Sequence, residues 1–409
     1  MAEKKTAVAK AKAAKARAAK KVKAKPTRSM LAGVQAVVAK VLKEDDPTVT
    51  VDSNSLTESR PHMTSGSVIL DYLIGGAPNK LGVAPCPGWP QGMISNIYGH
   101  ESSGKTTVAL ECAAAVCAAG GAVCFIDWEH AISKDYAAAL GCPIDDPNKF
   151  YLVQPNTLEA GLTVLFACAR AGVHLIILDS VGAGMPKEFK DQAIEEKGKM
   201  GRVGLVASKW SKILPDLAAD ISESGSHVMG LSQMRKMINT SGYGPSTTHQ
   251  GGQAWKYYSA LRMSFRRVKS IKTKDYDALT HKNVERFTSA VIKAKVEKSK
   301  VSNSQQREAE FHITFGEGID NVRDLIAVGT AHSIVVKSGS WYNFEMTDGT
   351  VVRAQGGVGF KNEILTTDGA YDDLAVRVLN AIRAGGKDTA VPVKDDDDDV
   401  DEALGFLTD

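Results

Sequence analysis

Short apolar runs alternate with longer amphipathic stretches through the middle of the chain. The apolar runs are MISNIYG, AVCFID, FYLVQ, LIILDS and HVMGLSQ, and helical stretches follow from residue 105, from residue 136 and over residues 158–171. Fully apolar strands connected by helices are typical of a parallel sheet that is covered on both faces. The runs LRMSFRRV and EFHITFG and a strand around Val291 extend it. The pattern predicts an α/β fold with a mostly parallel sheet flanked by helices.

The two ends of the chain differ in pattern from this central part. Apolar residues recur at helical spacing over residues 29–42, and Pro47 ends that run. After residue 318 the pattern predicts a helix over 324–328, a hairpin from GSWYNFE and GTVVRA, and a last helix over 371–384. We therefore expect a basic arm (1–28), a helix and linker (29–64), the core (65–318), a small C-terminal α/β domain (319–390) and an acidic tail (391–409).

The charge of the 409-residue chain is concentrated at its ends. Residues 1–28 hold 11 Lys or Arg against one Glu, residues 395–409 hold eight acids and no base, and the whole chain carries a net charge of +3. The basic arm is either a solvated tail or a polyelectrolyte arm that binds nucleic acid through phosphate neutralisation. No apolar run approaches the roughly 20 residues that cross a bilayer, so we expect a cytoplasmic protein without a membrane partner.

The six cysteines show no metal-ligand spacing. They lie between residues 86 and 168, and none of them forms a CxxC pair. Free thiols buried in a reducing compartment are the expectation.

One glycine-rich segment matches the phosphate-binding pattern GxxxxGK[ST]. Because it lies between a predicted strand and a predicted helix, its backbone N–H groups can converge on phosphates. Lys105 can neutralise the β and γ oxygens, and the Thr106 hydroxyl can hold magnesium (Mg2+). The predicted nucleotide-binding residues are Gly99, His100, Glu101, Ser102, Ser103, Gly104, Lys105, Thr106 and Thr107.

Two carboxylates follow buried strands downstream of this loop. Asp179 ends LIILD, where an acid can hold the magnesium shell. Glu129 follows FID, where a general base could orient the water that attacks the γ-phosphate. The spacing of Glu129 fits equally a surface acid that caps the next turn.

Five motifs together resemble the bacterial RecA family. GHESSGKTT, FIDWEHA, LIILDSV, LSQMR and GGQAWKYYSALRMSFRR occur in that family's order and approximate spacing, over residues 65–318. The resemblance implies a DNA-dependent ATPase that uses ATP and Mg2+, forms filaments on single-stranded DNA and pairs that strand with double-stranded DNA in recombination and repair. It assigns Glu129 as catalytic base, Tyr136 against adenine and Gln233 as γ-phosphate sensor. Single-strand-binding and mediator proteins are expected partners.

Residues 234–250 have the chemistry of a DNA-binding loop. Basic residues stand at its root, Tyr243 lies between glycines, and a Ser/Thr cluster precedes Gly251. Such a segment without regular structure can contact phosphates and stack a ring on bases. The resemblance makes it the second DNA-binding loop and residues 188–202 the first. The predicted DNA-binding residues are Arg202, Arg235, Lys236, Tyr243, Thr247, Thr248, Gly251 and Gly252.

The resemblance also implies contacts between subunits. Lys298 and Lys300 in KVEKSK resemble lysines that reach the ATP of the next protomer, whereas the residues alone indicate a charged edge strand. The helix over 29–42 resembles the family's N-terminal helix, which docks on a neighbouring subunit and mediates oligomerisation.

Several residues depart from the family pattern. His100 replaces a proline, Ser133 stands where an acid near adenine is usual, and Phe315 replaces a tyrosine. Together with the basic arm, these departures favour a phage-borne or otherwise divergent member. Two other classes share some features: a ring-forming helicase on the same ATPase core, and a histone-like DNA-condensing protein. The segments after Asp179 favour the recombinase.

Overall fold

The computed structural model describes seven stretches of the chain. They are residues 61–75, 88–190, 202–236, 247–249, 252–277, 281–304 and 307–383. All of them belong to one structural unit, Ser59–Asp409. The helix predicted over 29–42 and both charged tails lie outside the described residues.

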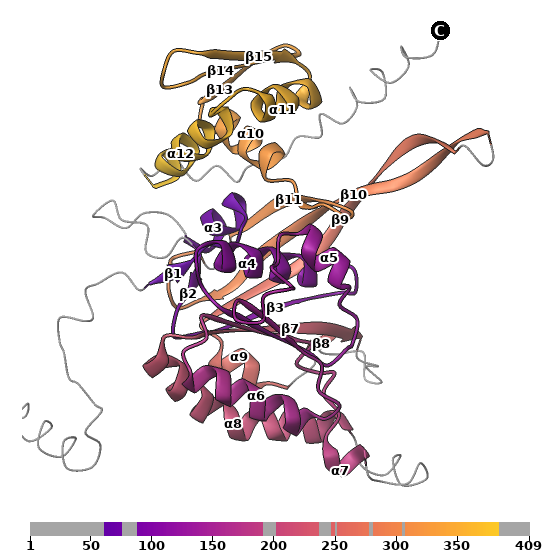
Figure 1. The fold of residues 1–409 in the computed structure, drawn as a ribbon, viewed down its shortest axis with the longest axis vertical. Helices are drawn as coiled ribbons and strands as arrows, with labels where there is room; N and C mark the ends of the chain where they lie inside the picture. The colour runs from indigo at the N-terminus through magenta and orange to yellow at the C-terminus, as the bar shows by residue number, and fades with distance from the viewer. Residues whose placement is uncertain are drawn as a thin grey trace, which may run out of the picture. The chain divides into compact units, whose positions relative to one another are not determined.

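A ten-stranded sheet forms the centre of this unit (Figure 1). Its strand order is β12-β11-β10-β9-β3-β7-β6-β4-β5, and β8 pairs with β7. The parallel part consists of β5 (Phe150–Val153), β4 (Val123–Asp127), β6 (Leu175–Asp179), β7 (His227–Lys236), β3 (Ile94–Gly99) and β9 (Leu261–Asp277). The antiparallel extension consists of β10 (Lys282–Ser299), β11 (Glu308–Thr314) and β12 (Gly318–Ile319). The predicted mostly parallel sheet is confirmed.

Helices cover both faces of the sheet, as Figure 1 shows. One face carries α4 (Lys105–Ala118) and α5 (Lys134–Ala139), and the other carries α6 (Leu158–Arg170), α8 (Arg202–Ser224) and α9 (Ala254–Tyr258). Successive side chains of a buried strand point to opposite faces of the sheet, so they pack alternately into two hydrophobic clusters. In β4, Val123 and Phe125 join one cluster, while Cys124 and Ile126 join the other. Burial on both faces explains why these strands read as continuous apolar runs.

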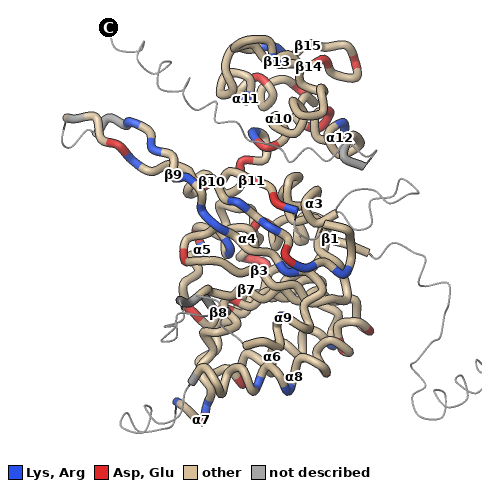
Figure 2. The backbone as a smooth tube through the Cα atoms, turned by 180° about the vertical axis from the view of Figure 1, so that it is seen from behind, with Lys and Arg blue, Asp and Glu red and all other residues tan. Residues whose placement is uncertain are grey.

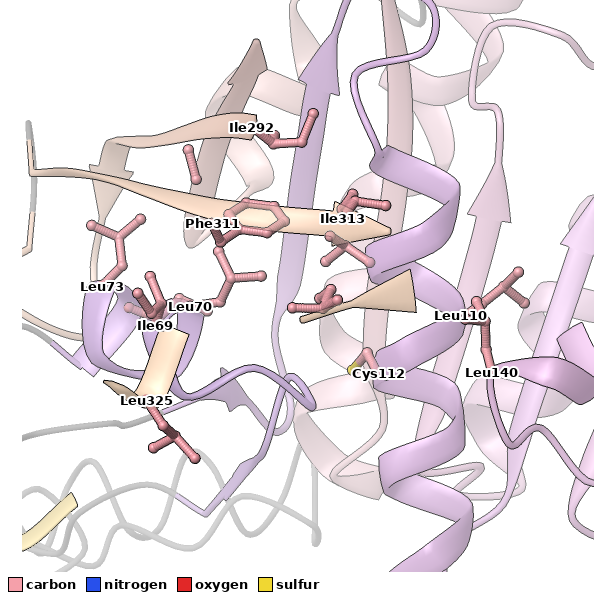
Figure 3. Close-up of a cluster of buried hydrophobic side chains, with 14 of the residues drawn as sticks. Ile69, Leu70, Leu73, Leu110, Cys112, Leu140, Ile292, Phe311, Ile313 and Leu325 are labelled. Carbon is pink, nitrogen blue, oxygen red and sulfur yellow. The ribbon is translucent and has the colours of Figure 1, made fainter. Parts of the chain in front are cut away.

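The antiparallel extension shares a hydrophobic cluster with the phosphate-loop helix (Figure 3). Its residues come from α3 (Val68–Gly75), from β10 and β11, and from α4, and include Ile69, Leu70, Leu73, Ile292, Phe311, Ile313, Leu110 and Cys112. This packing fixes α4 against the far strands of the sheet. It therefore contributes to the position of the segment that precedes α4.

Strands β9 and β10 form a long hairpin, and Figure 2 shows basic residues along the length of both strands. Lys295 in β10 pairs with Ser264 of β9 on one side and with Glu308 of β11 on the other. The strand is therefore internal to the sheet at Lys295, whereas Lys298, among the described residues, pairs only with Arg262 of β9.

The elements after β12 match most of the predicted order. They are α10 (Asn321–Ala331), β13 (Val335–Ser338), β14 (Trp341–Glu345), β15 (Val351–Gln355), α11 (Gly357–Thr366) and α12 (Ala370–Arg383). The predicted helix, hairpin and last helix are confirmed, whereas β13 and α11 were not predicted. The domain boundaries themselves stay a prediction.

Candidate functional site

The glycine-rich segment forms a tight loop between β3 and α4. Gly104 has a φ of 82° and directly precedes the helix. A Cβ on Gly104 would lie 2.5 Å from Ile313 Cδ1, and a Cβ on Gly99 would lie 2.3 Å from the Phe265 carbonyl oxygen. Gly99 is therefore required by space, because the atom it would meet belongs to the backbone, whereas Gly104 is favoured by its left-handed backbone conformation. The loop presents the N-terminus of α4, which favours anions through its free N–H groups and its dipole.

Lys105 is the first residue of α4, directly after this loop, with 8% of its surface exposed. Its Nζ donates to the carbonyl oxygens of His100 at 2.7 Å and Gly99 at 3.2 Å. Burial lowers the pKa of Lys105, and the nearby carboxylates, led by Asp179, partly oppose the shift. His100 contributes its carbonyl oxygen to this arrangement, so its contact with Lys105 does not depend on its side chain.

Thr106 and Asp179 are brought together from α4 and β6. Thr106 Oγ1 donates to Asp179 Oδ2 at 2.8 Å. Burial raises the pKa of Asp179 to about 7, and the carboxylates of Glu129 and Asp127 add to that rise. A hydroxyl and a carboxylate fit Mg2+, which takes one or two protein oxygens and completes its shell with phosphate and water. Within the described residues, no group of three or more His, Cys, Asp or Glu could hold a metal ion by itself.

Glu129 lies where the ends of three parallel strands meet. Its Oε1 accepts from Ser180 Oγ at 2.5 Å and from Gln233 Nε2 at 3.0 Å. These residues follow β4, follow β6 and lie within β7, respectively. Ser133, and not Glu129, caps the next helix, because Ser133 Oγ accepts from the Tyr136 N–H. The carboxylate of Glu129 thus bonds to residues at the ends of the neighbouring strands and does not cap the next helix.

Two further contacts join the loop to neighbouring elements. The Tyr136 hydroxyl lies 2.9 Å from Thr107 Oγ1, which connects α5 to α4. From β9, Arg267 donates through Nε and Nη2 to the Ser102 carbonyl oxygen, at 3.0 and 2.6 Å. Arg267 also lies over the ring of Phe315, with 5.8 Å between Cζ and the ring centroid. Neither Ser180 nor Arg267 was predicted for the site, although both lie inside the motifs LIILDSV and GGQAWKYYSALRMSFRR.

Lys298 and Lys300 lie away from the phosphate loop of their own chain. Lys298 pairs with Arg262 in the sheet, and its Nζ donates to the carbonyl oxygens of Lys256 and Tyr257 at 2.8 and 2.9 Å. Burial, together with the charges of Lys300, Arg262 and Lys256, lowers the pKa of Lys298 to about 8. The Lys300 N–H donates to the Ala260 carbonyl oxygen, and the Ala260 N–H donates to Ile94 at the start of β3. The phosphate loop follows the opposite end of β3.

The predicted second DNA-binding loop is shorter than the sequence suggested. Strand β7 continues to Lys236, and β8 (Thr247–His249) pairs with it, with Lys236 opposite Thr247 and Arg235 opposite Thr248. Continued strand pairing at both ends is the reason. Tyr243 and Gly251 lie outside the described residues, as does most of the first predicted loop.

Arg202 is the last residue of the first predicted loop, and Gly252 follows the second. Arg202 is the first residue of α8. Gly252 has a φ of +87°, and a Cβ there would lie 2.7 Å from Ala207 Cβ in α8. The chain that follows the second segment is therefore packed closely on the helix that follows the first.

Comparison with known families gives a match over most of the chain. Residues 50–320 match the model of the RecA N-terminal domain. The chain belongs to the RecA family. Protein RecA of Staphylococcus aureus strain JH9 is 39% identical over 284 residues, which cover 69% of this chain and 73% of that protein. The same values hold for Protein RecA of strains Newman and Mu50.

Membership of the RecA family establishes the activity. The chain is a DNA-dependent ATPase that binds ATP, forms filaments on single-stranded DNA and catalyses homologous pairing and strand exchange in recombination and repair. The expectation drawn from the five motifs is confirmed. The roles of individual residues remain predictions.

Two remaining features of this RecA-family chain bear on earlier expectations. In the described part of the chain, Cys112, Cys117, Cys124 and Cys142 are buried free thiols, and Cys168 is a partly exposed free thiol. The predicted burial is thus confirmed for four of the cysteines. No helix among the described residues is long and apolar enough to cross a membrane.

Proposed function

We propose that Glu129 is the general base of ATP hydrolysis in this chain and that Gln233 couples it to bound DNA. The observation that carries the proposal is the 3.0 Å hydrogen bond from Gln233 Nε2 to Glu129 Oε1. Gln233 lies in β7 and directly precedes residues 234–250, the second predicted DNA-binding loop. A displacement of that strand on DNA binding would therefore change the orientation of the Glu129 carboxylate.

The other residues of the site bind the phosphates, Mg2+ and adenine of the nucleotide and position Glu129. Lys105 and the N–H groups at the start of α4 neutralise phosphate oxygens. Thr106 and Asp179 hold Mg2+, which supplies charge neutralisation at the β and γ oxygens when it is bound. Tyr136 lies against the adenine. Ser180 donates to Glu129 and, together with Gln233, limits the rotation of its carboxylate, so that one oxygen stays available to accept a proton from the attacking water.

The same proposal extends to partners and location. The residues of the two predicted loops, among them Arg202, Arg235 and Tyr243, bind single-stranded DNA by phosphate contacts and base stacking. Single-strand-binding and mediator proteins assist filament assembly. The protein acts in the cytoplasm of a bacterial cell, or of an infected host cell if it is phage-encoded.

Two substitutions separate nucleotide binding from hydrolysis. Lys105→Ala should lose nucleotide binding, because it removes the buried cation of the loop. Glu129→Gln should bind ATP with unchanged affinity yet hydrolyse it at least ~100-fold more slowly, within the range for loss of a general base. Glu363→Gln, an exposed acid on α11, is the matched control and should leave both properties unchanged. Equal hydrolysis by Glu129→Gln and Glu363→Gln would remove Glu129 from the mechanism.

A further inference from the structure

Three of the five tryptophans of the chain contact one another close to Glu129, Ser180 and Gln233, which we call the Glu129 cluster. Trp128 directly precedes Glu129, Trp210 lies in α8 and Trp255 lies in α9. Their exposed fractions are 7%, 0% and 2%. The rings of Trp128 and Trp210 are 6.3 Å apart at 90°, and those of Trp210 and Trp255 are 5.0 Å apart at 71°. We call these three residues the tryptophan ladder.

Each tryptophan of the ladder lies in, or contacts, a segment that carries a different member of the Glu129 cluster. Trp128 is the residue before Glu129, and its Nε1 donates to the Thr157 carbonyl oxygen at 3.1 Å. Trp210 Nε1 donates to the carbonyl oxygen of Val181, the residue after Ser180, at 2.8 Å. The Val181 N–H in turn donates to the Leu231 carbonyl oxygen of β7 at 2.9 Å. The ladder therefore fixes the backbone next to Ser180 as well as next to Glu129.

Trp255 completes the set on β7, the strand of Gln233. A Cβ on Gly230 would lie 2.5 Å from Trp255 Cζ3, and a Cβ on Gly161 would lie 2.2 Å from Trp128 Cζ2. The ladder fits only because these two positions carry no side chain. Among the described residues, the buried Nε1 of Trp255 has no hydrogen-bond partner, so ring packing alone holds this indole.

Trp210 and Trp255 lie in the helices that follow the two predicted DNA-binding segments. Helix α8 begins at Arg202, and α9 begins at Ala254, two residues after Gly252. The contact between Trp210 and Trp255 joins these two helices directly. Interiors are close-packed, so a shift of either helix is transmitted to the rings rather than absorbed by free space.

We infer that Trp128, Trp210 and Trp255 are positioning residues that align Glu129 for hydrolysis when DNA is bound. DNA bound by the two predicted segments fixes α8 and α9, and the ladder transfers that position to the residues beside Glu129, Ser180 and Gln233. The inference rests on the proposed function of Glu129. It adds a second route from DNA to the base, through aromatic packing, beside the hydrogen bond from Gln233.

The test compares Trp210→Phe with Trp89→Phe in the full chain. Trp89 is also completely buried, but it lies in the other hydrophobic cluster, so its variant controls for the loss of a buried indole. Trp210→Phe should lower kcat with saturating single-stranded DNA at least ~5-fold, part of the roughly 100-fold that misplacement of a catalytic group can cost. Its kcat without DNA, its ATP affinity and its DNA affinity should stay within about twofold of the values for Trp89→Phe, because a positioning role changes alignment and not binding.

A double-mutant cycle identifies the group through which the ladder acts. In a Glu129→Gln background, Trp210→Phe should lower the residual rate by less than about twofold, because residues that act through one group are not additive. A full additional ~5-fold loss in that background would overturn the inference. So would equal DNA stimulation in Trp210→Phe and Trp89→Phe.

The experiments also distinguish failure of the ladder from failure of the proposed function of Glu129. Should Trp210→Phe fail to fold, Trp255→Phe provides the same comparison, since it removes an N–H without a partner and keeps an aromatic ring. If Glu129→Gln retained wild-type hydrolysis, the proposed function would fail first. If Glu129→Gln behaved as proposed while both ladder variants kept full DNA stimulation, only the ladder would fail.

Discussion

Replacement of Lys298 and Lys300 by alanine should stop hydrolysis without preventing nucleotide binding. Within one chain, Lys300 bonds to Ala260, five residues before Phe265, which lies opposite Gly99 of the phosphate loop. At roughly 3.3 Å per residue this backbone separation is about 17 Å. Lys298, opposite Arg262, lies about 10 Å from the same level of the sheet.

Distances of this size decide between action within one subunit and action on the next. Two unit charges in water interact by about 0.2 kcal/mol at about 17 Å and by about 0.4 kcal/mol at about 10 Å, and a screening length of about 8 Å reduces both energies further. Cations delivered across an interface to a transferring phosphoryl group accelerate hydrolysis by about 10³–10⁵-fold, or about 4–7 kcal/mol. A loss of at least ~100-fold in the double variant would therefore require contact with a neighbour's nucleotide.

Mixed filaments provide the assay. The double alanine variant and Glu129→Gln should each be inactive alone, yet a 1:1 mixture should recover up to about a quarter of the wild-type rate. The recovery arises at head-to-tail junctions that pair an intact Glu129 with intact lysines. Co-assembly is checked by pull-down of differently tagged subunits. Mixtures that co-assemble and recover no hydrolysis would refute action in trans.

Three further predictions concern DNA binding and stability. Tyr243→Ala should weaken single-stranded DNA affinity by about 1–3 kcal/mol, the usual contribution of a base–aromatic stack; unchanged affinity and strand exchange would exclude stacking. Removal of residues 395–409 should strengthen duplex binding, chiefly at low salt, because eight acids no longer compete with DNA; an unchanged salt dependence would leave the tail no such role. Burial raises the pKa of Asp324 from 3.8 to about 6, against the opposing effect of its bond to His312. The free energy of unfolding, measured relative to Asp324→Asn, should thus be highest below pH ~4 and fall by up to ~3 kcal/mol as the pH rises through ~6; parallel pH curves would contradict this.

The sequence predicts those parts of the structure that local pattern determines. Strands buried on both faces read as apolar runs, and the phosphate loop is recognisable because its backbone accommodates glycine at positions where other residues are strained. Helix α11 was missed because three of its first four positions, counting the cap, are glycine, which lowers helix propensity. Strand β8 was missed because it has only 3 residues and is defined by its pairing with the end of β7.

The contacts that complete the site could not be predicted, because they join distant residues. Ser180 and Glu129 are 51 positions apart, and Arg267 and Ser102 are 165 positions apart. The tryptophans of the ladder come from three separate elements, so no spacing in the sequence indicates their contact. The sequence did identify Glu129 and Gln233 as candidates, but only the fold brings them to hydrogen-bonding distance.

The alternatives left open by the sequence have different outcomes. A histone-like DNA-condensing protein would explain the basic arm, but it does not explain why residues 50–320 match the RecA N-terminal domain. A ring-forming helicase shares the phosphate loop. It does not share membership of the RecA family, on which the recombinase activity rests.

The most direct test of the account is steady-state ATP hydrolysis by the wild-type chain with and without saturating single-stranded DNA. The proposed connection from the predicted DNA-binding segments to Glu129, through Gln233 and the tryptophan ladder, predicts that DNA raises kcat at least ~10-fold, which is part of the roughly 10²–10⁴-fold that general-base catalysis contributes. Equal rates in the presence and absence of DNA, for protein shown to bind both ATP and DNA, would contradict it.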